Sequence, residues 1–254
     1  MISVSVIGHN EERSVRRCLE SVRWAGEIVF VDCASTDETA RIASEFTGKV
    51  YSRENNSNLN VNKQFGIDRC AGEWVLYIDP DEVVTEELKN EIIAAVGRSP
   101  SGISGYLIPR KNYYFGRFLR FGGKYPDRQL RLFRKNVGGF ECRSVHERIS
   151  IKGGIEKLKN PMLHYPYGSV SDMLKKSDFY SSRKAELLFS KGARRPRPLS
   201  APLAKFLRNY FVRVGFLDGF TGLAVCLMDS YNEMLTALKL KEICDDRLAG
   251  RKSA

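Results

Sequence analysis

The first hundred residues alternate short runs rich in β-branched residues with segments whose apolar residues recur at helical spacing. This alternation is typical of βαβ units, in which parallel strands share one sheet and helices cover its two faces. Strands are predicted at residues 3–7, 27–31, 49–52 and 74–78. Helices are predicted near 15–22 and 39–46, the second capped by Ser35 or Thr36. We therefore predict an α/β fold with a Rossmann-like, mostly parallel sheet and a C-terminal helical tail.

Polar segments follow three of these strands. Ligands of open α/β sheets bind beyond the carboxyl ends of the strands, so chemistry is expected at residues 8–12, 32–37 and 79–82. The strongest signal is Asp79-Pro80-Asp81, where a buried strand ends in two carboxylates. Hard oxygen ligands in this position suit Mg²⁺ or Mn²⁺, which can bridge to a diphosphate. A solvated acidic turn explains the same residues when they are taken alone.

Several segments resemble the successive motifs of family 2 inverting glycosyltransferases, which have the GT-A fold. They are residues 3–12, 31–39, 62–66 and 71–82, and they follow one another in the family's order and spacing. Residues 126–134 and 145–147 are also similar to the branch that adds β-linked glucose to the lipopolysaccharide or lipooligosaccharide core. The resemblance implies a hexosyltransferase that uses UDP-glucose, Mg²⁺ or Mn²⁺, and a glycan or glycolipid acceptor.

The resemblance also implies roles for single residues. Asp32 would recognise the nucleotide base, uracil, and Asn10 and Glu11 would shape the same pocket. Lys63 stands where the family usually has arginine; it can neutralise a diphosphate but gives up the bidentate fork. Asp79 would contact the ribose or the metal.

Asp81 would hold the metal. Pro80 replaces the usual small residue between the two carboxylates and removes a backbone donor, which puts the backbone contact to the donor sugar in doubt.

An inverting transfer needs a general base on the acceptor side of the sugar, and Glu147 is the candidate. An ordinary surface carboxylate paired with a neighbouring arginine is the alternative. His146 is assigned to the metal or the diphosphate, although a structural histidine fits as well. Arg128 and Arg131 are expected on one face of a strand, where they can bind the diphosphate or an acidic acceptor; a solvated strand face explains them nearly as well.

The net charge of +11 is unevenly placed, with +2 in residues 1–150 and +9 in residues 151–254. A basic C-terminal part can meet nucleic acid, an anionic membrane surface or an acidic acceptor. A nucleic-acid-binding protein would not need carboxylates grouped at strand ends, so no nucleic-acid partner is expected. A dinucleotide-dependent oxidoreductase would carry GxGxxG after its first strand, and residues 8–13 do not. A family 2 transferase that acts on a lipid-linked or protein acceptor is the alternative function within the same family.

The predicted domain organisation is a catalytic domain over 1–193 and a tail over 194–254. Residues 1–100 would bind the nucleotide sugar, and residues 101–193, with β segments rich in aromatics and arginine, would form the acceptor half. A proline-basic linker begins the tail, and a basic amphipathic helix is expected over 202–217. The N-terminus carries no secretion signal and the six cysteines are scattered. We expect a cytoplasmic protein that binds peripherally to the inner membrane through this helix; packing of the helix on the catalytic domain explains its apolar face equally well.

Overall fold

The computed structural model describes residues 1–56, 58–98, 101–142 and 149–252, the last five by their backbone only. Its contacts divide the chain into two compact units. The sheet unit comprises Met1–Lys111 and Asp127–His164, and the helical unit comprises Asn112–Pro126 and Tyr165–Ala254. The helical unit thus begins at Tyr165 and takes in residues 112–126, whereas the sequence suggested a boundary after residue 193.

Four parallel strands form the first half of the main sheet, in the order β3-β2-β1-β4. Their bounds are Ile2–Gly8 for β1, Glu27–Asp32 for β2, Val50–Ser52 for β3 and Trp74–Ile78 for β4. These are the four strands predicted from the sequence. Gly8 pairs with Asp32 and Val6 with Ile78, so the carboxyl ends of β1, β2 and β4 reach the same edge of the sheet.

The second half of the sheet is mixed. β8 (Asp127–Arg134) runs antiparallel to β4 and to β6 (Ile103–Tyr114), and β12 (Met162–His164) runs antiparallel to β5 (Glu82–Val83). The remaining short elements are β7 (Arg117–Phe118), β9 (Gly138–Gly139), β10 (Ser150–Ile151), β11 (Gly154–Lys157) and the 3₁₀ turn η1 (Lys135–Val137). β11 pairs with β6 in parallel, and β9 and β10 pair with each other in a separate two-stranded sheet.

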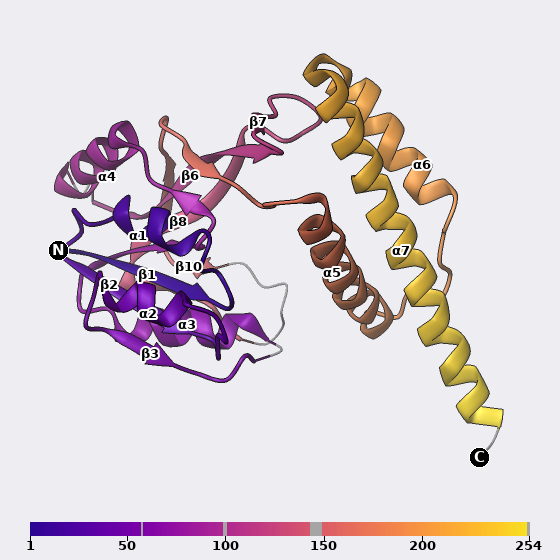
Figure 1. Ribbon diagram of the computed structural model, residues 1–254, viewed down its shortest axis with the longest axis horizontal. Helices are drawn as coiled ribbons and strands as arrows, with labels where there is room; N and C mark the ends of the chain where they lie inside the picture. The colour runs from indigo at the N-terminus through magenta and orange to yellow at the C-terminus, as the bar shows by residue number, and fades with distance from the viewer. Residues whose placement is uncertain (57, 99–100, 143–148, 253–254) are drawn as a thin grey trace. The chain divides into compact units, whose positions relative to one another are not determined.

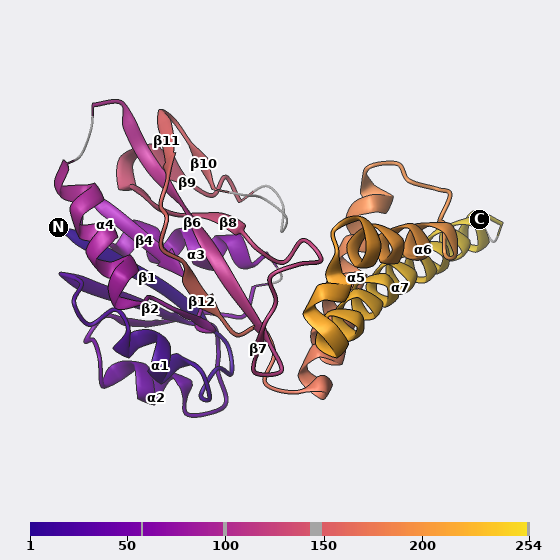
Figure 2. The ribbon, with the colours of Figure 1, turned by 90° about the horizontal axis from the view of Figure 1, so that it is seen from above.

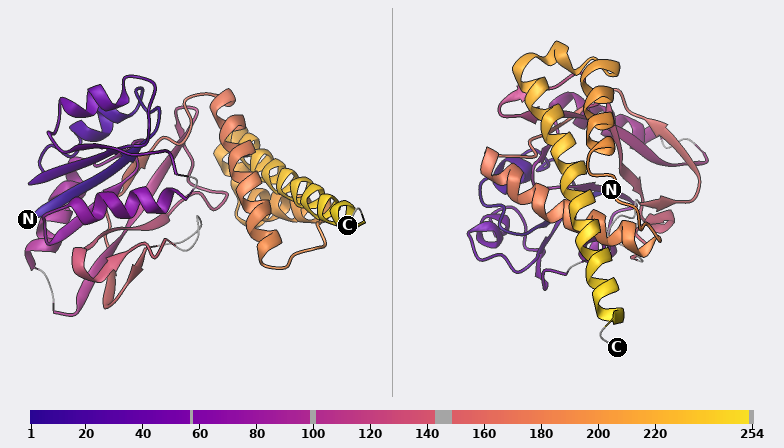
Figure 3. Two further views of the ribbon diagram at one scale, coloured as in Figure 1. Left: turned by 90° about the horizontal axis from the view of Figure 1, so that it is seen from below. Right: turned by 90° about the vertical axis from the view of Figure 1, so that its right-hand side faces the viewer.

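Helices cover both faces of the sheet (Figures 2 and 3). α1 (Val15–Glu20), α2 (Thr39–Ser44) and α4 (Glu86–Arg98) bury their apolar residues against one face, where Phe30, Trp74 and Leu76 are fully buried. α3 (Leu59–Arg69) packs through Ile67 on the other face. Successive side chains of each strand point to opposite faces of the sheet, so each strand contributes apolar residues to the cores on both faces. The prediction of an α/β fold with helices on both faces is confirmed.

The start of α2 differs from the prediction. The residue in the capping position is Glu38, which makes no side-chain cap bond. Ser35 instead accepts a hydrogen bond from the backbone N–H of Asn10, and Asp37 accepts one from the backbone N–H of Thr39 at 3.0 Å. The preceding loop therefore uses Ser35 to hold the 8–12 segment, and Asp37 satisfies the first amide of the helix.

The helical unit is built on three helices that pack through α7 (Figure 1). α5 spans Val170–Ser190, α6 spans Ser200–Leu207 and α7 spans Gly219–Lys252. The buried residues of α5 recur every four positions as Met173, Ser177, Ser181 and Ala185. Three of the four are small, which lets α5 lie close against its neighbour.

The single amphipathic helix predicted over 202–217 is wrong. α6 ends at Leu207 and is followed by a π-helical turn, Arg208–Val212 (η2), and a 3₁₀ turn, Gly215–Asp218 (η3). Val214 between them is left-handed, with φ of 49°, and breaks the helix. Within the described residues no single helix has the length and apolar character of a membrane span, although the helix pair Ser200–Val212 and Gly215–Arg247, bent by 73°, has both when taken together.

Candidate active site

Two loops at the carboxyl edge of the parallel strands brace each other. Asn10 is left-handed, with φ of 56°, a conformation that asparagine tolerates. Its backbone N–H donates to the Ser35 hydroxyl at 3.0 Å, and its side-chain oxygen accepts from the Thr36 backbone N–H at 2.8 Å. The Glu11 backbone N–H donates to the Thr39 hydroxyl at 2.7 Å. Asn10 and Glu11 therefore fix the shape of the loop that follows β2.

Asp32 lies inside this braced loop at the end of β2 and is buried. One carboxylate oxygen accepts the backbone N–H of Ser35 at 3.2 Å. The other oxygen is buried and has no hydrogen-bond partner among the described residues. Buried acceptors without a donor are rare in native proteins. Asp32 is therefore a position at which a donor from a ligand would complete the hydrogen bonding.

Asp79 follows β4 and lies among cations. It accepts hydrogen bonds from the Tyr77 hydroxyl at 2.5 Å and from the guanidinium of Arg131. Burial acts to raise the pKa of Asp79, but the charges of Arg131 and Lys63 hold that pKa well below its usual range. Asp79 is thus a fixed anion beside the cationic groups that surround it.

Glu82, three residues after Asp79, accepts hydrogen bonds from two arginines. It is fully buried; one oxygen accepts from Arg110 at 3.0 Å and from Arg131 at 2.6 Å, and the other accepts the Asp79 backbone N–H at 2.9 Å. Burial disfavours both guanidinium charges, yet Glu82 and its acidic neighbours keep the pKa of Arg110 and of Arg131 above the usual value. This role of Glu82 was not predictable from the sequence, because the two arginines come from β6 and β8, far along the chain.

A cavity of about 400 Å³ opens beside Asp79. Its cationic lining consists of Lys63, Arg110, Arg128 and Arg131, against the single carboxylate of Asp79. The other lining residues are Tyr77, Leu107, Gln129, Leu130, Phe140 and Ile149. The Lys63 ammonium lies 5.3 Å from the Tyr77 ring centre and 5.6 Å from that of Phe140. Glu82 and Asp127 pair with Arg110, and Glu82 and Asp79 pair with Arg131, so the positive charge that remains comes mainly from Lys63 and Arg128. Positive charge in this position suits a diphosphate.

A bulge explains how Arg128 and Arg131 both reach the cavity. Residues three apart point to opposite faces of a regular strand. In β8, Leu130 pairs with Leu107 and Leu132 with the next residue, Tyr106, so Arg131 is an extra residue without a partner on β6. One inserted residue restores Arg131 to the face of Arg128. The two arginines differ in environment, since Arg131 is buried and Arg128 is exposed.

Asp81 lies beside a histidine that the sequence analysis missed. His164 ends β12, which pairs with β5 so that His164 stands opposite Glu82. Its Nε2 is 3.6 Å from Oδ1 of Asp81, and both side chains are about 15% exposed. The available signal was a short apolar run ending in a metal-binding residue, Met162-Leu163-His164, the same pattern that marks β4. Within the described part of the chain no group of three or more His, Cys, Asp or Glu side chains is arranged around one point.

Glu147 and His146 lie outside the described residues. Of the acidic residues near them in sequence, Asp127 is held by Arg110, whose Nε donates to it at 2.9 Å.

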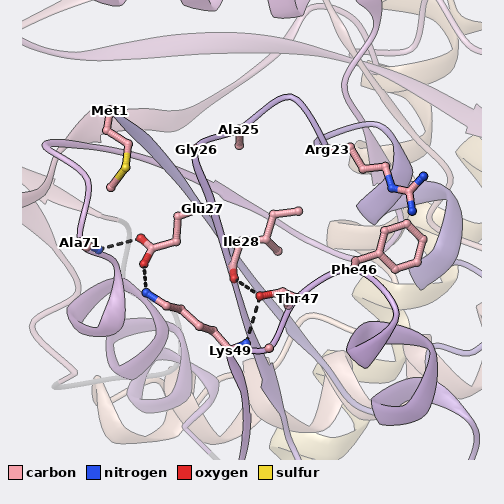
Figure 4. Close-up of a pocket in the computed structure, with 11 residues that line it drawn as sticks. Met1, Arg23, Ala25, Gly26, Glu27, Ile28, Phe46, Thr47, Lys49 and Ala71 are labelled. Carbon is pink, nitrogen blue, oxygen red and sulfur yellow. Dashed lines mark hydrogen bonds and ion pairs between the residues drawn. The ribbon is translucent and has the colours of Figure 1, made fainter.

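A second cavity, of about 890 Å³, lies at the opposite, amino end of the strands (Figure 4). Its carboxylate, Glu27, is paired with Lys49 and accepts the Ala71 backbone N–H at 2.7 Å and the Ser3 hydroxyl. These bonds use both carboxylate oxygens. Glu27 therefore links the start of β2 to Ser3 in β1, to Lys49 and to Ala71.

Comparison with known proteins shows the family of the chain. The model of glycosyl transferase family 2 matches residues 3–151. The chain belongs to this family. It is a glycosyltransferase, and the predicted GT-A-type α/β fold and the predicted enzyme class are confirmed. The family membership excludes the oxidoreductase and the non-enzymatic interpretations.

Relatives of this glycosyltransferase align over nearly its whole length. It is 28% identical to the lipopolysaccharide core biosynthesis glycosyltransferase LpsC of Rhizobium meliloti, over 94% of this chain and 91% of the relative. It is 28% identical to an uncharacterized glycosyltransferase of Rickettsia typhi, over 95% and 87%. Among solved structures, S. aureus TarS 1–349 in complex with UDP-GlcNAc is similar, with 17% identity, coverage of 98% and 92%, and a TM-score of 0.49.

Proposed function

We propose that this enzyme transfers glucose, with inversion, from UDP-glucose to a hydroxyl of a lipopolysaccharide core or a similar glycan acceptor, and that it uses Mg²⁺ or Mn²⁺. The observation that carries the proposal is the cationic cavity beside Asp79, at the carboxyl edge of the parallel strands. The acceptor class is supported by the name of the Rhizobium relative, which acts in lipopolysaccharide core biosynthesis.

The donor would lie with its diphosphate in the cationic cavity and its base at Asp32. Lys63, Arg128 and Arg131 supply positive charge for the diphosphate, and charge-assisted hydrogen bonds of this kind are roughly twice as strong as neutral ones. Asp32 offers its unsatisfied oxygen to an N–H donor, and the imide N–H of uracil is such a group. Asn10 and Glu11 hold the loop that presents Asp32.

Asp81 and His164 would hold the metal ion. Two atoms that each lie about 2.1 Å from one cation are at most about 4.2 Å apart, so the observed separation of 3.6 Å fits a shared ion. An oxygen and an imidazole nitrogen suit Mn²⁺ in particular. When bound, the ion neutralises charge on the departing diphosphate. We assign this role to His164, whereas His146, the histidine predicted from the sequence, lies outside the described residues.

Glu147 is proposed as the general base. It would accept the proton of the acceptor hydroxyl while that oxygen forms a bond to C1 of the sugar. The bond from C1 to the diphosphate oxygen breaks at the same time, and UDP leaves with the electron pair. Attack from the side opposite the diphosphate gives inversion.

The test is release of nucleotide by the purified chain from UDP-glucose, UDP-galactose, UDP-N-acetylglucosamine and GDP-mannose, each with Mn²⁺ and with excess chelator. We expect UDP-glucose to be the best donor and the chelator to abolish turnover. A preference for GDP-mannose would contradict the assignment of uracil to Asp32. Full turnover in chelator would contradict the metal assignment to Asp81 and His164.

A further inference from the structure

The segment from Leu199 to Leu227 exposes an unusual amount of apolar surface. Nineteen large hydrophobic side chains are exposed among the described residues, and nine of them fall in these 29 positions: Leu199, Leu203, Leu207, Phe211, Val212, Phe216, Leu217, Phe220 and Leu227. Phe220, Leu199 and Val212 are 83%, 81% and 78% exposed. Single exposed apolar residues are ordinary, but a concentrated group indicates an interaction surface.

Hydrogen bonds and a close backbone contact hold the helix break at the centre of this segment. Asp218 is buried and accepts the backbone N–H groups of Arg120 and Phe121 at 3.2 and 2.8 Å. A Cβ on Gly222 would lie 2.2 Å from the carbonyl oxygen of Gly215, so the backbone of η3 lies directly against the first turn of α7. The chain around the break is thus held by internal bonds while its large apolar side chains point to solvent.

Rings on both sides of the break support one another. Phe206 stacks on Tyr210 with centroids 5.2 Å apart, and Tyr210 meets Phe211 and Phe216 edge to face. α6 and α7 run side by side and are joined at this break (Figure 1). Clustered aromatics with a tyrosine hydroxyl are characteristic of protein surfaces at the membrane–water boundary.

Charge indicates which partner covers this surface. Residues 191–217 contain seven lysines and arginines and no aspartate or glutamate. The first carboxylate after them, Asp218, is buried and bonded to backbone amides. Cations next to apolar side chains match an anionic lipid bilayer, which offers phosphate groups outside and hydrocarbon beneath. Nucleic acid would satisfy the cations but not Phe220 or Val212.

We propose that residues 199–227 form a membrane-docking surface, in which the apolar side chains at the helix break enter the boundary of an anionic bilayer and the flanking cations bind its headgroups. The helix pair Ser200–Val212 and Gly215–Arg247, bent by 73° at the break, together has the length and apolar composition of a candidate membrane span, so this part of the chain is apolar enough to enter a bilayer. In the proposed function this places the enzyme on the cytoplasmic face of the inner membrane, close to a glycolipid acceptor.

The test is flotation of the full-length protein with vesicles of phosphatidylcholine alone and of phosphatidylcholine mixed with phosphatidylglycerol. We expect binding to the anionic vesicles that weakens as salt is raised. The paired substitution Val212→Ser and Phe220→Ser should weaken this binding by about tenfold or more. Replacing Arg195 and Arg197 by Gln should weaken it about fivefold per residue on anionic vesicles only.

The matched control is Leu174→Ser with Phe179→Ser, two exposed apolar residues of α5, and it should bind as the native chain does. Thermal unfolding should be unchanged in every variant, because all the substituted side chains are exposed. Equal binding by the Val212/Phe220 variant and the native chain would overturn the proposal. Failure to bind either vesicle, together with self-association that this variant abolishes, would assign the surface to a second copy of the chain. Salt-sensitive binding to duplex DNA instead of vesicles would assign it to nucleic acid. None of these outcomes depends on which sugar the enzyme transfers.

Discussion

Two buried carboxylates, Glu82 and Asp32, lie at the same edge of the sheet in opposite states. Glu82 accepts hydrogen bonds from two arginines and a backbone amide, so both of its oxygens are used. Asp32 has one bonded oxygen and one without a partner among the described residues. A carboxylate that the protein satisfies holds the protein together, whereas one that it leaves unsatisfied is available to a ligand. The comparison separates structural from binding residues at one site.

Glu147 is a third carboxylate, and its proposed role is to accept a proton from the acceptor hydroxyl. Glu147→Gln keeps size and most hydrogen bonding but removes basicity, so turnover should fall about 10² to 10⁴-fold. UDP affinity should not change, because the base acts on the acceptor side. Single-turnover rates at saturating acceptor, with UDP titration alongside, measure both effects. Near-normal turnover would remove Glu147 as the base.

Glu82→Gln should mainly cost stability. It leaves two buried guanidinium groups partly uncompensated, and removing one partner of a buried ion pair costs about 3 to 5 kcal/mol. Urea unfolding measures the loss. Glu86→Gln, at a carboxylate exposed on the first turn of α4, is the matched control and should change stability by less than about 0.5 kcal/mol. Equal stability of the two variants would remove the distinction between Glu82 and Asp32.

Asp32→Asn should show the reverse pattern. The amide oxygen can still accept the Ser35 amide, so the free energy of unfolding should change by less than about 1 kcal/mol. UDP affinity should fall about 10- to 100-fold, because a hydrogen bond to a charged group is lost. Calorimetric titration of UDP tests this, with Asp68→Asn on the exposed side of α3 as the control. Unchanged affinity would mean that Asp32 does not read the base.

Glu27, at the opposite end of the sheet, should also stabilise the fold, but by less than Glu82 does. Burial acts to raise its pKa, but Lys49, Ser3 and the Ala71 amide lower the pKa below its usual value. The unfolded chain therefore takes up a proton first as pH falls, so Glu27 contributes stability above about pH 4.3 that is lost at lower pH. Urea unfolding of native and Glu27→Gln proteins should differ at about pH 7 and converge by about pH 3. A constant difference would contradict this role.

The sequence predicted what depends on neighbouring residues. The β-branched runs marked all four parallel strands, and the polar residues after them marked the carboxyl edge, because strand direction and side-chain alternation are local properties. The Glu82 network, the partnership of Asp81 with His164 and the bulge at Arg131 depend on which distant strands pair, and no local pattern encodes that.

The helical tail shows a missed local signal. Apolar spacing continues through residues 202–217 and favoured one helix, but Gly215 falls inside this stretch and Asp218-Gly219 follows it directly. Asp-Gly is a dipeptide typical of turns. The backbone contact between Gly215 in η3 and Gly222 in the first turn of α7 fixes the break, and only the folded structure shows it.

The central claim is that the cationic cavity binds the diphosphate of the donor. Titration of UDP in the presence of Mn²⁺ into the native chain and into Arg128→Ala tests it most directly, because Arg128 lines the cavity but is exposed and lies outside the bonds to Glu82. The account predicts that UDP binds the native chain and binds Arg128→Ala about tenfold more weakly, while Arg134→Ala, on the same strand but outside the cavity, binds as the native chain does. Equal UDP affinity in all three proteins, or no binding to the native chain, would contradict it.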